Sequence, residues 1–177
     1  IGPVETEIRD ALKDHIWGVA EETPQERLGD ILRSNGLTLA TMESITGGSI
    51  ASKITDVPGS SEYFRGGFVA YTNAMKVAMG VDPGVIDEYG VVSPQVAEAM
   101  SEAACCWGGS DVGLGITGVA GPAELDQHPP GEVYIGLSFK GKTLSIRGSF
   151  VAQRALVKER ATVQALLELY KFIKERI

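Results

Sequence analysis

Two short segments of this sequence combine a nucleophile with a group that can activate it. The first, residues 42–48 (Met-Glu-Ser-Ile-Thr-Gly-Gly), places Ser44 and Thr46 directly before Gly47 and Gly48. Glycines allow backbone N–H groups to approach an oxyanion closely, and a helix that begins there favours negative charge. The segment therefore predicts a nucleophile facing backbone donors. A plain serine N-cap followed by a glycine turn remains the structural alternative.

The second segment, residues 71–76 (Tyr-Thr-Asn-Ala-Met-Lys), supplies the base. A serine nucleophile usually relies on histidine, but His15 lies near the N-terminus and nothing in the sequence orients His128. A lysine can serve instead when burial lowers its pKa toward neutrality. Lys76 follows a helix start by one turn, and Tyr71 would hold its amine or relay a proton. A surface lysine and a core tyrosine remain the alternative.

A third segment, residues 116–122 (Ile-Thr-Gly-Val-Ala-Gly-Pro), has the composition of an anion-binding loop. Its small residues would expose successive backbone N–H groups, and Thr117 would add a hydroxyl, as in a phosphate or carboxylate cradle. It is neither a P-loop nor a dinucleotide fingerprint, because it lacks both GKS/T and GxGxxG. Ligands of α/β proteins bind outside the carboxyl ends of strands, so we expect all three segments to meet at one crevice.

Alternating strand-like and helix-like stretches surround these segments. Thr23-Pro24 and Ser93-Pro94 each join an N-cap to a proline at the first helical position, which predicts a helix start. We expect helices at residues 4–14, 25–34, 48–54, 72–79, 93–106 and 154–177, and strands at residues 37–41, 68–71, 111–117, 133–139 and 144–151. Residues 16–20 are interpreted as a strand or extended link, and residues 87–90 as a turn.

This order of elements predicts the fold class α/β. The expected architecture is a three-layer α/β/α sandwich with a mixed, mostly parallel sheet and one antiparallel hairpin. Residues 21–177 would form this domain, and residues 1–20 would be an N-terminal appendage that links it to a preceding domain. The first residue is Ile1 rather than Met, which we interpret as the mark of a fragment of a longer protein.

Composition narrows the classes of partner. The 177 residues, 44% of them hydrophobic, are enough to bury one core without metals or disulfides. The net charge of −7 argues against a nucleic-acid partner, which requires clustered Lys and Arg. No apolar run approaches the ~20 residues of a membrane helix, so no membrane partner is expected. Cys105 and Cys106 predict two buried thiols in a reducing, cytoplasmic protein, and no metal-ligand spacing occurs.

Five motifs together resemble one known family. They are residues 41–48, residues 55–67 with their Pro-Gly-Ser-Ser and paired glycines, residues 71–76, residues 90–93 and residues 117–122, in this order. The sequence is identified on these motifs as similar to the CinA C-terminal domain, or nicotinamide mononucleotide amidohydrolase (PncC), family. The similarity spans about residues 28–167. In larger members this domain follows a molybdopterin-binding-like domain, and residues 1–20 resemble the stretch that joins the two.

The resemblance implies hydrolysis of nicotinamide mononucleotide to nicotinate mononucleotide and ammonia, without a metal or organic cofactor. It makes Ser44 the nucleophile, Lys76 the general base and Tyr71 their partner. Other residues would bind the substrate: Thr46, Gly47 and Gly48 at the oxyanion and pocket, Thr117, Gly118, Ala120 and Gly121 at the 5′-phosphate or ribose, and Arg154 beside them. A mononucleotide is the expected small-molecule partner, and an apolar final helix would suit a homo-oligomer.

Three departures from the family pattern bear on substrate choice. Ile45 replaces a cysteine, residues 152–154 keep the arginine of a Gly-Asp-Arg motif but lose its aspartate, and residues 122–134 lose glycines and a lysine. The last segment gains Glu124, Asp126 and Glu132, and carboxylates beside a phosphate would repel it. Two alternative functions stay open: a catalytically weak regulatory or oligomerisation domain, and a Ser–Lys hydrolase of a non-phosphorylated amide.

Overall fold

The computed structural model describes residues 2–12 and 21–177, so His15 and the predicted link at residues 16–20 lie outside the described residues. The helices are α1 (Gly2–Leu12), α2 (Pro24–Ser34), α3 (Ser49–Thr55), the 3-10 turn η2 (Ser60–Glu62), α4 (Asn73–Ala78), α5 (Pro83–Tyr89), α6 (Pro94–Gly108) and α7 (Arg154–Lys174). The strands are β1 (Leu39–Glu43), β2 (Phe64–Val69), β3 (Val112–Gly118), β4 (Glu132–Phe139) and β5 (Lys142–Ser149).

The five strands form one mixed sheet in the order β2-β1-β3-β4-β5. Strand β1 pairs in parallel with both β2 and β3, whereas β4 pairs antiparallel with β3 and with β5. The α/β class, the mixed sheet and the β4–β5 hairpin are therefore confirmed. The antiparallel β3–β4 pair is an addition that the sequence analysis did not specify.

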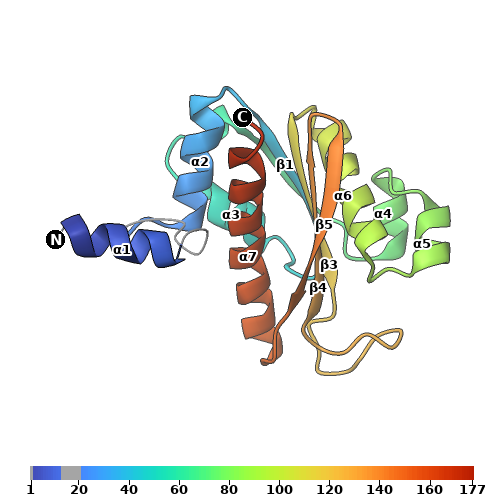
Figure 1. Ribbon diagram of the computed structural model, residues 1–177. Helices are drawn as coiled ribbons and strands as arrows, with labels where there is room; N and C mark the ends of the chain where they lie inside the picture. Colours follow the sequence, from blue (N-terminus) through green and yellow to red (C-terminus); the bar gives the residue numbers. More distant parts are fainter. Residues whose placement is uncertain (1, 13–20) are drawn as a thin grey trace.

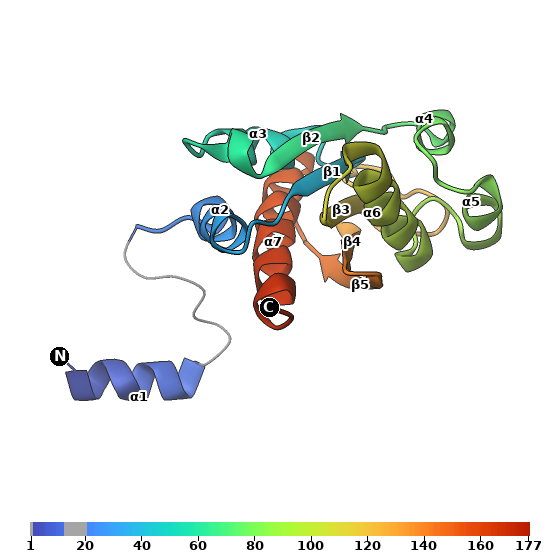
Figure 2. The same ribbon diagram turned by 90° about the horizontal axis from the view of Figure 1, so that it is seen from above.

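Helices cover both faces of the sheet and make three layers (Figure 1 and Figure 2). Helices α2, α3 and α7 lie on one face, and α6 lies on the other with α4 and α5 beside it. The side chains of β1 alternate between two cores: Leu39 joins the core under α2, α3 and α7, and Ala40 and Met42 join the core under α6. Helix α1 lies apart from these layers in both views.

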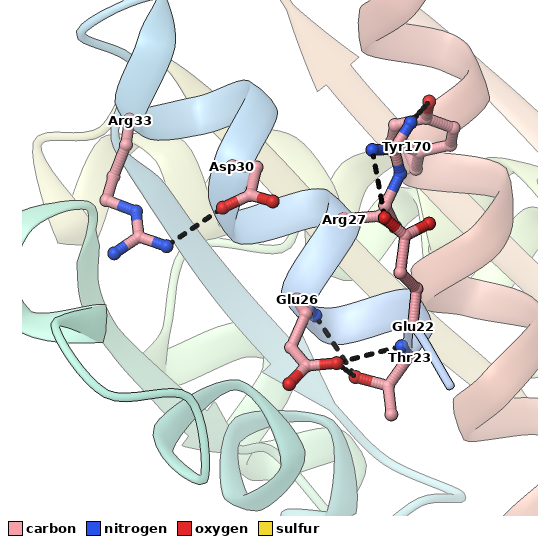
Figure 3. Close-up of polar contacts among 7 residues, drawn as sticks. All are labelled: Glu22, Thr23, Glu26, Arg27, Asp30, Arg33 and Tyr170. Carbon is pink, nitrogen blue, oxygen red and sulfur yellow. Dashed lines mark hydrogen bonds and ion pairs between the residues drawn. The ribbon is translucent and has the colours of Figure 1, made fainter. Parts of the chain in front are cut away.

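The start of α2 shows how local sequence fixes an element and docks it. The Thr23 hydroxyl accepts a hydrogen bond from the Glu26 N–H, and the Glu26 carboxylate accepts one from the Thr23 N–H, which is a complete capping box (Figure 3). One turn later, the Arg27 guanidinium donates to the Tyr170 hydroxyl of α7 at 3.2 Å. The predicted helix start at Thr23-Pro24 is confirmed.

The backbone of helix α6 approaches the sheet closely because the strands beneath it carry glycines. A Cβ atom built on Gly136 of β4 would stand 1.9 Å from the Ala97 carbonyl oxygen, and one on Gly113 of β3 would stand 2.0 Å from the Ser101 carbonyl oxygen. No side chain fits at either position. The glycines therefore set the distance between this helix and the strands that it covers.

Two predictions about local structure are wrong. Residues 87–90 do not form a separate turn, because Asp82 caps a helix at Pro83 that continues to Tyr89. Strand β2 begins at Phe64 rather than at residue 68 and ends at Val69, before Tyr71.

The two cysteines are not both buried. Cys105 is half-buried and Cys106 is exposed, because adjacent positions on α6 cannot both face the sheet. Burial still raises the pKa of the Cys105 thiol to about 11. Within the described residues, no helix has both the length and the apolar character needed to cross a membrane.

Candidate active site

The parallel strands bring the three polar segments to one edge of the sheet. Glu43, the last residue of β1, lies opposite Val69 of β2 and Ile116 of β3. The residues that follow each of the three strands therefore lie side by side. The pairing of β1 with β3 continues one residue further, because the Ser44 N–H donates to the Ile116 carbonyl oxygen at 3.0 Å. The predicted meeting of the three segments at the carboxyl ends of the strands is what the structure shows.

The central contact of this edge is between Ser44 and Lys76. The Lys76 ammonium nitrogen lies 3.1 Å from Ser44 Oγ and 3.0 Å from the Ala70 carbonyl oxygen. Helix α4 positions the lysine: the Thr72 hydroxyl caps its N-terminus by accepting from the Met75 N–H. Lys76 sits one turn further on, where its side chain reaches inward over the end of β1.

Burial changes the acid–base chemistry of this lysine. Lys76 is only 1% exposed, and burial lowers its pKa from 10.5 to about 8. Within the described part of the chain no carboxylate forms an ion pair with it, so no opposite charge offsets the desolvation of the charged form. An amine in this state can lose its proton near neutral pH and then accept the proton of the Ser44 hydroxyl.

Glu43 has a role that the sequence analysis missed. Its carboxylate is 1% exposed and accepts three backbone hydrogen bonds at the start of α3: from Gly48 at 3.0 Å, from Ile50 at 3.0 Å and from Ala51 at 2.8 Å. The negative charge at this helix N-terminus is thus supplied by the protein itself. The signal in the sequence was a carboxylate at the end of an otherwise apolar and neutral strand.

This cap corrects the expected roles of the two glycines. The Gly48 N–H is bound to Glu43, and the Gly47 N–H donates to the Ser44 carbonyl oxygen at 3.2 Å, so neither is free for an oxyanion. Among the described residues, the N–H groups of Ile45 and Thr46 donate to no protein acceptor. Of the two residues, Ile45 lines the cavity described below, so its N–H group is the one in the turn that is available to a substrate oxygen.

Thr46 itself is fully buried, and its hydroxyl has no hydrogen-bond partner in the described part of the chain. Its side chain and the two glycines do not line the cavity described next. Ile45, which replaces the cysteine of the family pattern, lines that cavity and also packs into the core. Within this turn, therefore, Ser44 and Ile45 line the cavity, whereas Thr46, Gly47 and Gly48 do not.

A cavity of about 360 Å³ opens beside Ser44 and Lys76. The glycine-rich segment forms one wall, and the N–H groups of Ala120 and Gly121 donate to no protein acceptor within the described residues. The Thr117 hydroxyl, in contrast, donates to the Val91 carbonyl oxygen at 2.8 Å and is already occupied. The lining residues are Ser44, Ile45, Tyr71, Asn73, Lys76, Val91, Val92, Thr117, Gly118, Val119, Ala120, Gly121, Ala123, Glu124, Leu125 and Arg154.

Tyr71 and Arg154 close the mouth of this cavity together. The Arg154 guanidinium donates to the Tyr71 hydroxyl at 3.0 Å and to the Gly121 carbonyl oxygen at 2.8 Å. Tyr71 is 59% exposed, and the contacts of the Lys76 amine are with Ser44 and Ala70. The geometry thus places Tyr71 with the arginine at the start of α7, where Gln153 caps the helix without a side-chain hydrogen bond.

The altered loop between β3 and β4 is built around a buried carboxylate. Glu132 is 5% exposed, accepts a hydrogen bond from the Tyr134 hydroxyl at 2.8 Å and forms an ion pair with Arg147 at 2.9 Å, while His128 Nδ1 lies 3.0 Å away. Burial alone would raise the pKa of Glu132, but these partners outweigh it and lower the pKa. Glu132 therefore anchors the loop and does not face the cavity, whereas Glu124 does.

The fold and the site define a class of protein: an α/β/α sandwich with a buried serine–lysine pair beside a cavity at the ends of its parallel strands. The sequence profile described as the CinA C-terminal domain matches residues 21–173. The chain belongs to this family.

Relatives support the assignment across the chain. A protein of Moorella thermoacetica described as competence-damage inducible is 42% identical over 97% of this chain, and a CinA-like protein of Kosmotoga olearia is 40% identical over 94%. The crystal structure of a CinA superfamily protein from Enterobacter cloacae superposes with a TM-score of 0.83 at 27% identity, covering 89% of this chain and 96% of that one. The chain spans only 42% and 41% of the length of the two relatives.

Proposed function

We propose that this domain is a metal-free amidohydrolase that converts nicotinamide mononucleotide to nicotinate mononucleotide and ammonia. The observation that carries the proposal is the 3.1 Å contact between Ser44 Oγ and the amine of Lys76, a lysine with a pKa lowered to about 8. A buried serine with a neutral amine at hydrogen-bond distance is the arrangement needed for nucleophilic attack on an acyl carbon. The family resemblance supplies the substrate.

The chemistry proceeds by acyl transfer in two steps. Neutral Lys76 takes the proton of the Ser44 hydroxyl as Oγ attacks the carboxamide carbon, and the N–H group of Ile45 donates to the oxyanion. The tetrahedral intermediate collapses when the protonated lysine returns that proton to the departing nitrogen, which leaves as ammonia. A water molecule then attacks the ester in the same way, releases the carboxylate and restores the serine.

The rest of the cavity would select the substrate. Ala120 and Gly121 present free N–H groups to the ribose or phosphate, and Tyr71 with Arg154 would hold the substrate at the mouth. In this geometry the Tyr71 hydroxyl would contact the substrate and not the Lys76 amine. The family resemblance implies instead that the Tyr71 hydroxyl is the direct partner of Lys76, and this stays a prediction.

One observation favours a second candidate, a Ser–Lys hydrolase of an amide without phosphate. Glu124 lines the cavity, and no cation forms an ion pair with it within the described residues. An unpaired carboxylate there repels a phosphate beside it, and the phosphate is the group in which the two candidate substrates differ.

A paired assay distinguishes the candidates. Nicotinamide mononucleotide and its dephosphorylated riboside are each incubated with the protein in a chelator, and ammonia and the acid product are quantified by chromatography. We expect ammonia and nicotinate mononucleotide from the first and a much lower rate from the riboside. A faster rate with the riboside would replace the first candidate by the second, and no product from either would reject both.

A further inference from the structure

A second hollow, of about 530 Å³, lies between α3 and α7 and shares Arg154 with the active-site cavity. Its lining is unlike the rest of this acidic protein, because three cations face one carboxylate. The residues that line it are Ser49, Lys53, Arg154, Ala155, Lys158, Glu159 and Thr162. A local excess of positive charge in a chain of net charge −7 requires a structural explanation.

The two lysines of this hollow are not used by the fold. Lys53 and Lys158 are half-buried, yet within the described residues neither forms an ion pair with a carboxylate, Glu159 included. Like charges held near one another without a counter-ion repel, which costs stability. Such an arrangement is stabilised when an anion binds between them.

The hollow also adjoins the turn that follows the nucleophile. A Cβ atom built on Gly47 would lie 3.4 Å from the Lys158 ammonium nitrogen, and the Gly47 N–H donates to the Ser44 carbonyl oxygen at 3.2 Å. Lys158 therefore lies against the turn that carries Ser44. Arg154 and Lys158 are four residues apart on α7, so both point to the same side of the helix.

We propose that Lys53, Lys158 and Arg154 form an anion subsite that takes the phosphate of a substrate whose amide is at Ser44. This inference rests on the proposed function and moves the phosphate away from the glycine-rich segment. At that segment Glu124 lines the wall and the Thr117 hydroxyl is already bound to Val91. The N–H groups of Ala120 and Gly121 are then left for the ribose hydroxyls.

Kinetics with matched variants test the subsite. Lys53→Gln and Lys158→Gln each remove one cation, and Lys142→Gln removes the same charge from the exposed start of β5 as a control. We expect Lys53→Gln and Lys158→Gln each to raise KM for nicotinamide mononucleotide by about tenfold, which corresponds to the loss of one charge-assisted hydrogen bond. The value of kcat and the kinetics with the riboside should not change. Lys142→Gln should match the wild type. An unchanged KM in both subsite variants would overturn the proposal.

A binding measurement keeps this test separate from turnover. Inorganic phosphate is titrated into the wild type and into the Lys53→Gln/Lys158→Gln double variant, and backbone amide shifts are followed by NMR. We expect saturable shifts at residues 49, 53 and 158 that are lost in the double variant and weaken at higher salt. Shifts confined to residues 118–121, or unspecific changes only, would overturn the subsite. Absence of ammonia release together with the expected shifts would overturn the proposed function and leave the subsite standing.

Discussion

The buried Lys76 predicts a specific dependence of activity on pH. If neutral Lys76 is the base, kcat/KM follows the fraction of the amine that has lost its proton. With its pKa at about 8, about one tenth of the lysine is neutral at pH 7, which is about 300-fold more than for a lysine at 10.5. We therefore expect kcat/KM to rise about tenfold between pH 7 and pH 9 and then to level off.

The assay is ammonia release from nicotinamide mononucleotide between pH 6 and pH 10 at constant ionic strength. Lys76→Arg is the matched control, because a guanidinium fits a cationic position but does not lose its proton in this range. It should lose nearly all activity at every pH. A wild-type profile that falls as pH rises, or a Lys76→Arg variant with the wild-type profile, would refute the assignment of Lys76 as the base.

The same burial makes Lys76 costly for the fold. Its pKa is lower in the folded state than in the unfolded chain, so between pH 8 and pH 10.5 the unfolded chain binds more protons and stability rises with pH. Below pH 8 the folded protein bears the full free-energy cost of burying the charged Lys76 amine, which is up to about 3 kcal/mol. We expect Lys76→Met to raise the free energy of unfolding at pH 7 by about that amount, as measured by urea denaturation. A variant less stable than the wild type at pH 7 would contradict this reasoning.

Three further substitutions test the supports of the site. Tyr71→Phe removes the acceptor of Arg154, so KM should rise about threefold with kcat unchanged in steady-state assays; a fall in kcat alone would instead assign the hydroxyl to proton relay. Glu43→Gln removes the charge that caps α3 and should lower the free energy of urea unfolding by about 2 kcal/mol. Unchanged stability would show that the cap contributes little. Gly136→Ala places a Cβ against the Ala97 carbonyl and should cost more than about 3 kcal/mol in thermal unfolding, whereas an unchanged Tm would refute the close packing of α6.

Much of the fold followed from local signals. The Thr23-Pro24 and Ser93-Pro94 pairs begin α2 and α6 as expected, because a capping hydroxyl and a fixed proline φ act within one turn. Asp82-Pro83 is the same device and begins α5, a helix that was not predicted from the sequence. Strand β2 was shortened because Gly66 and Gly67 weaken a strand pattern, although β-pairing with β1 restores it.

The site was predictable in its chemistry but not in its hydrogen bonds. Elimination of histidine pointed to Lys76 beside Ser44, and strand register then brings them together. Which N–H groups of the turn stay free depends on where the Glu43 carboxylate lies, and this is a tertiary property. The cations at Arg154 and Lys158, four residues apart on one helix, were a readable signal that the sequence analysis did not use.

Ammonia release by the wild type and by Ser44→Ala, measured in parallel at pH 9 in a chelator, tests the central claim most directly. The serine–lysine mechanism predicts release by the wild type and a loss of at least about a thousandfold in the variant, which should still bind nicotinamide mononucleotide. A Ser44→Ala variant that releases ammonia at the wild-type rate would contradict Ser44 as the nucleophile.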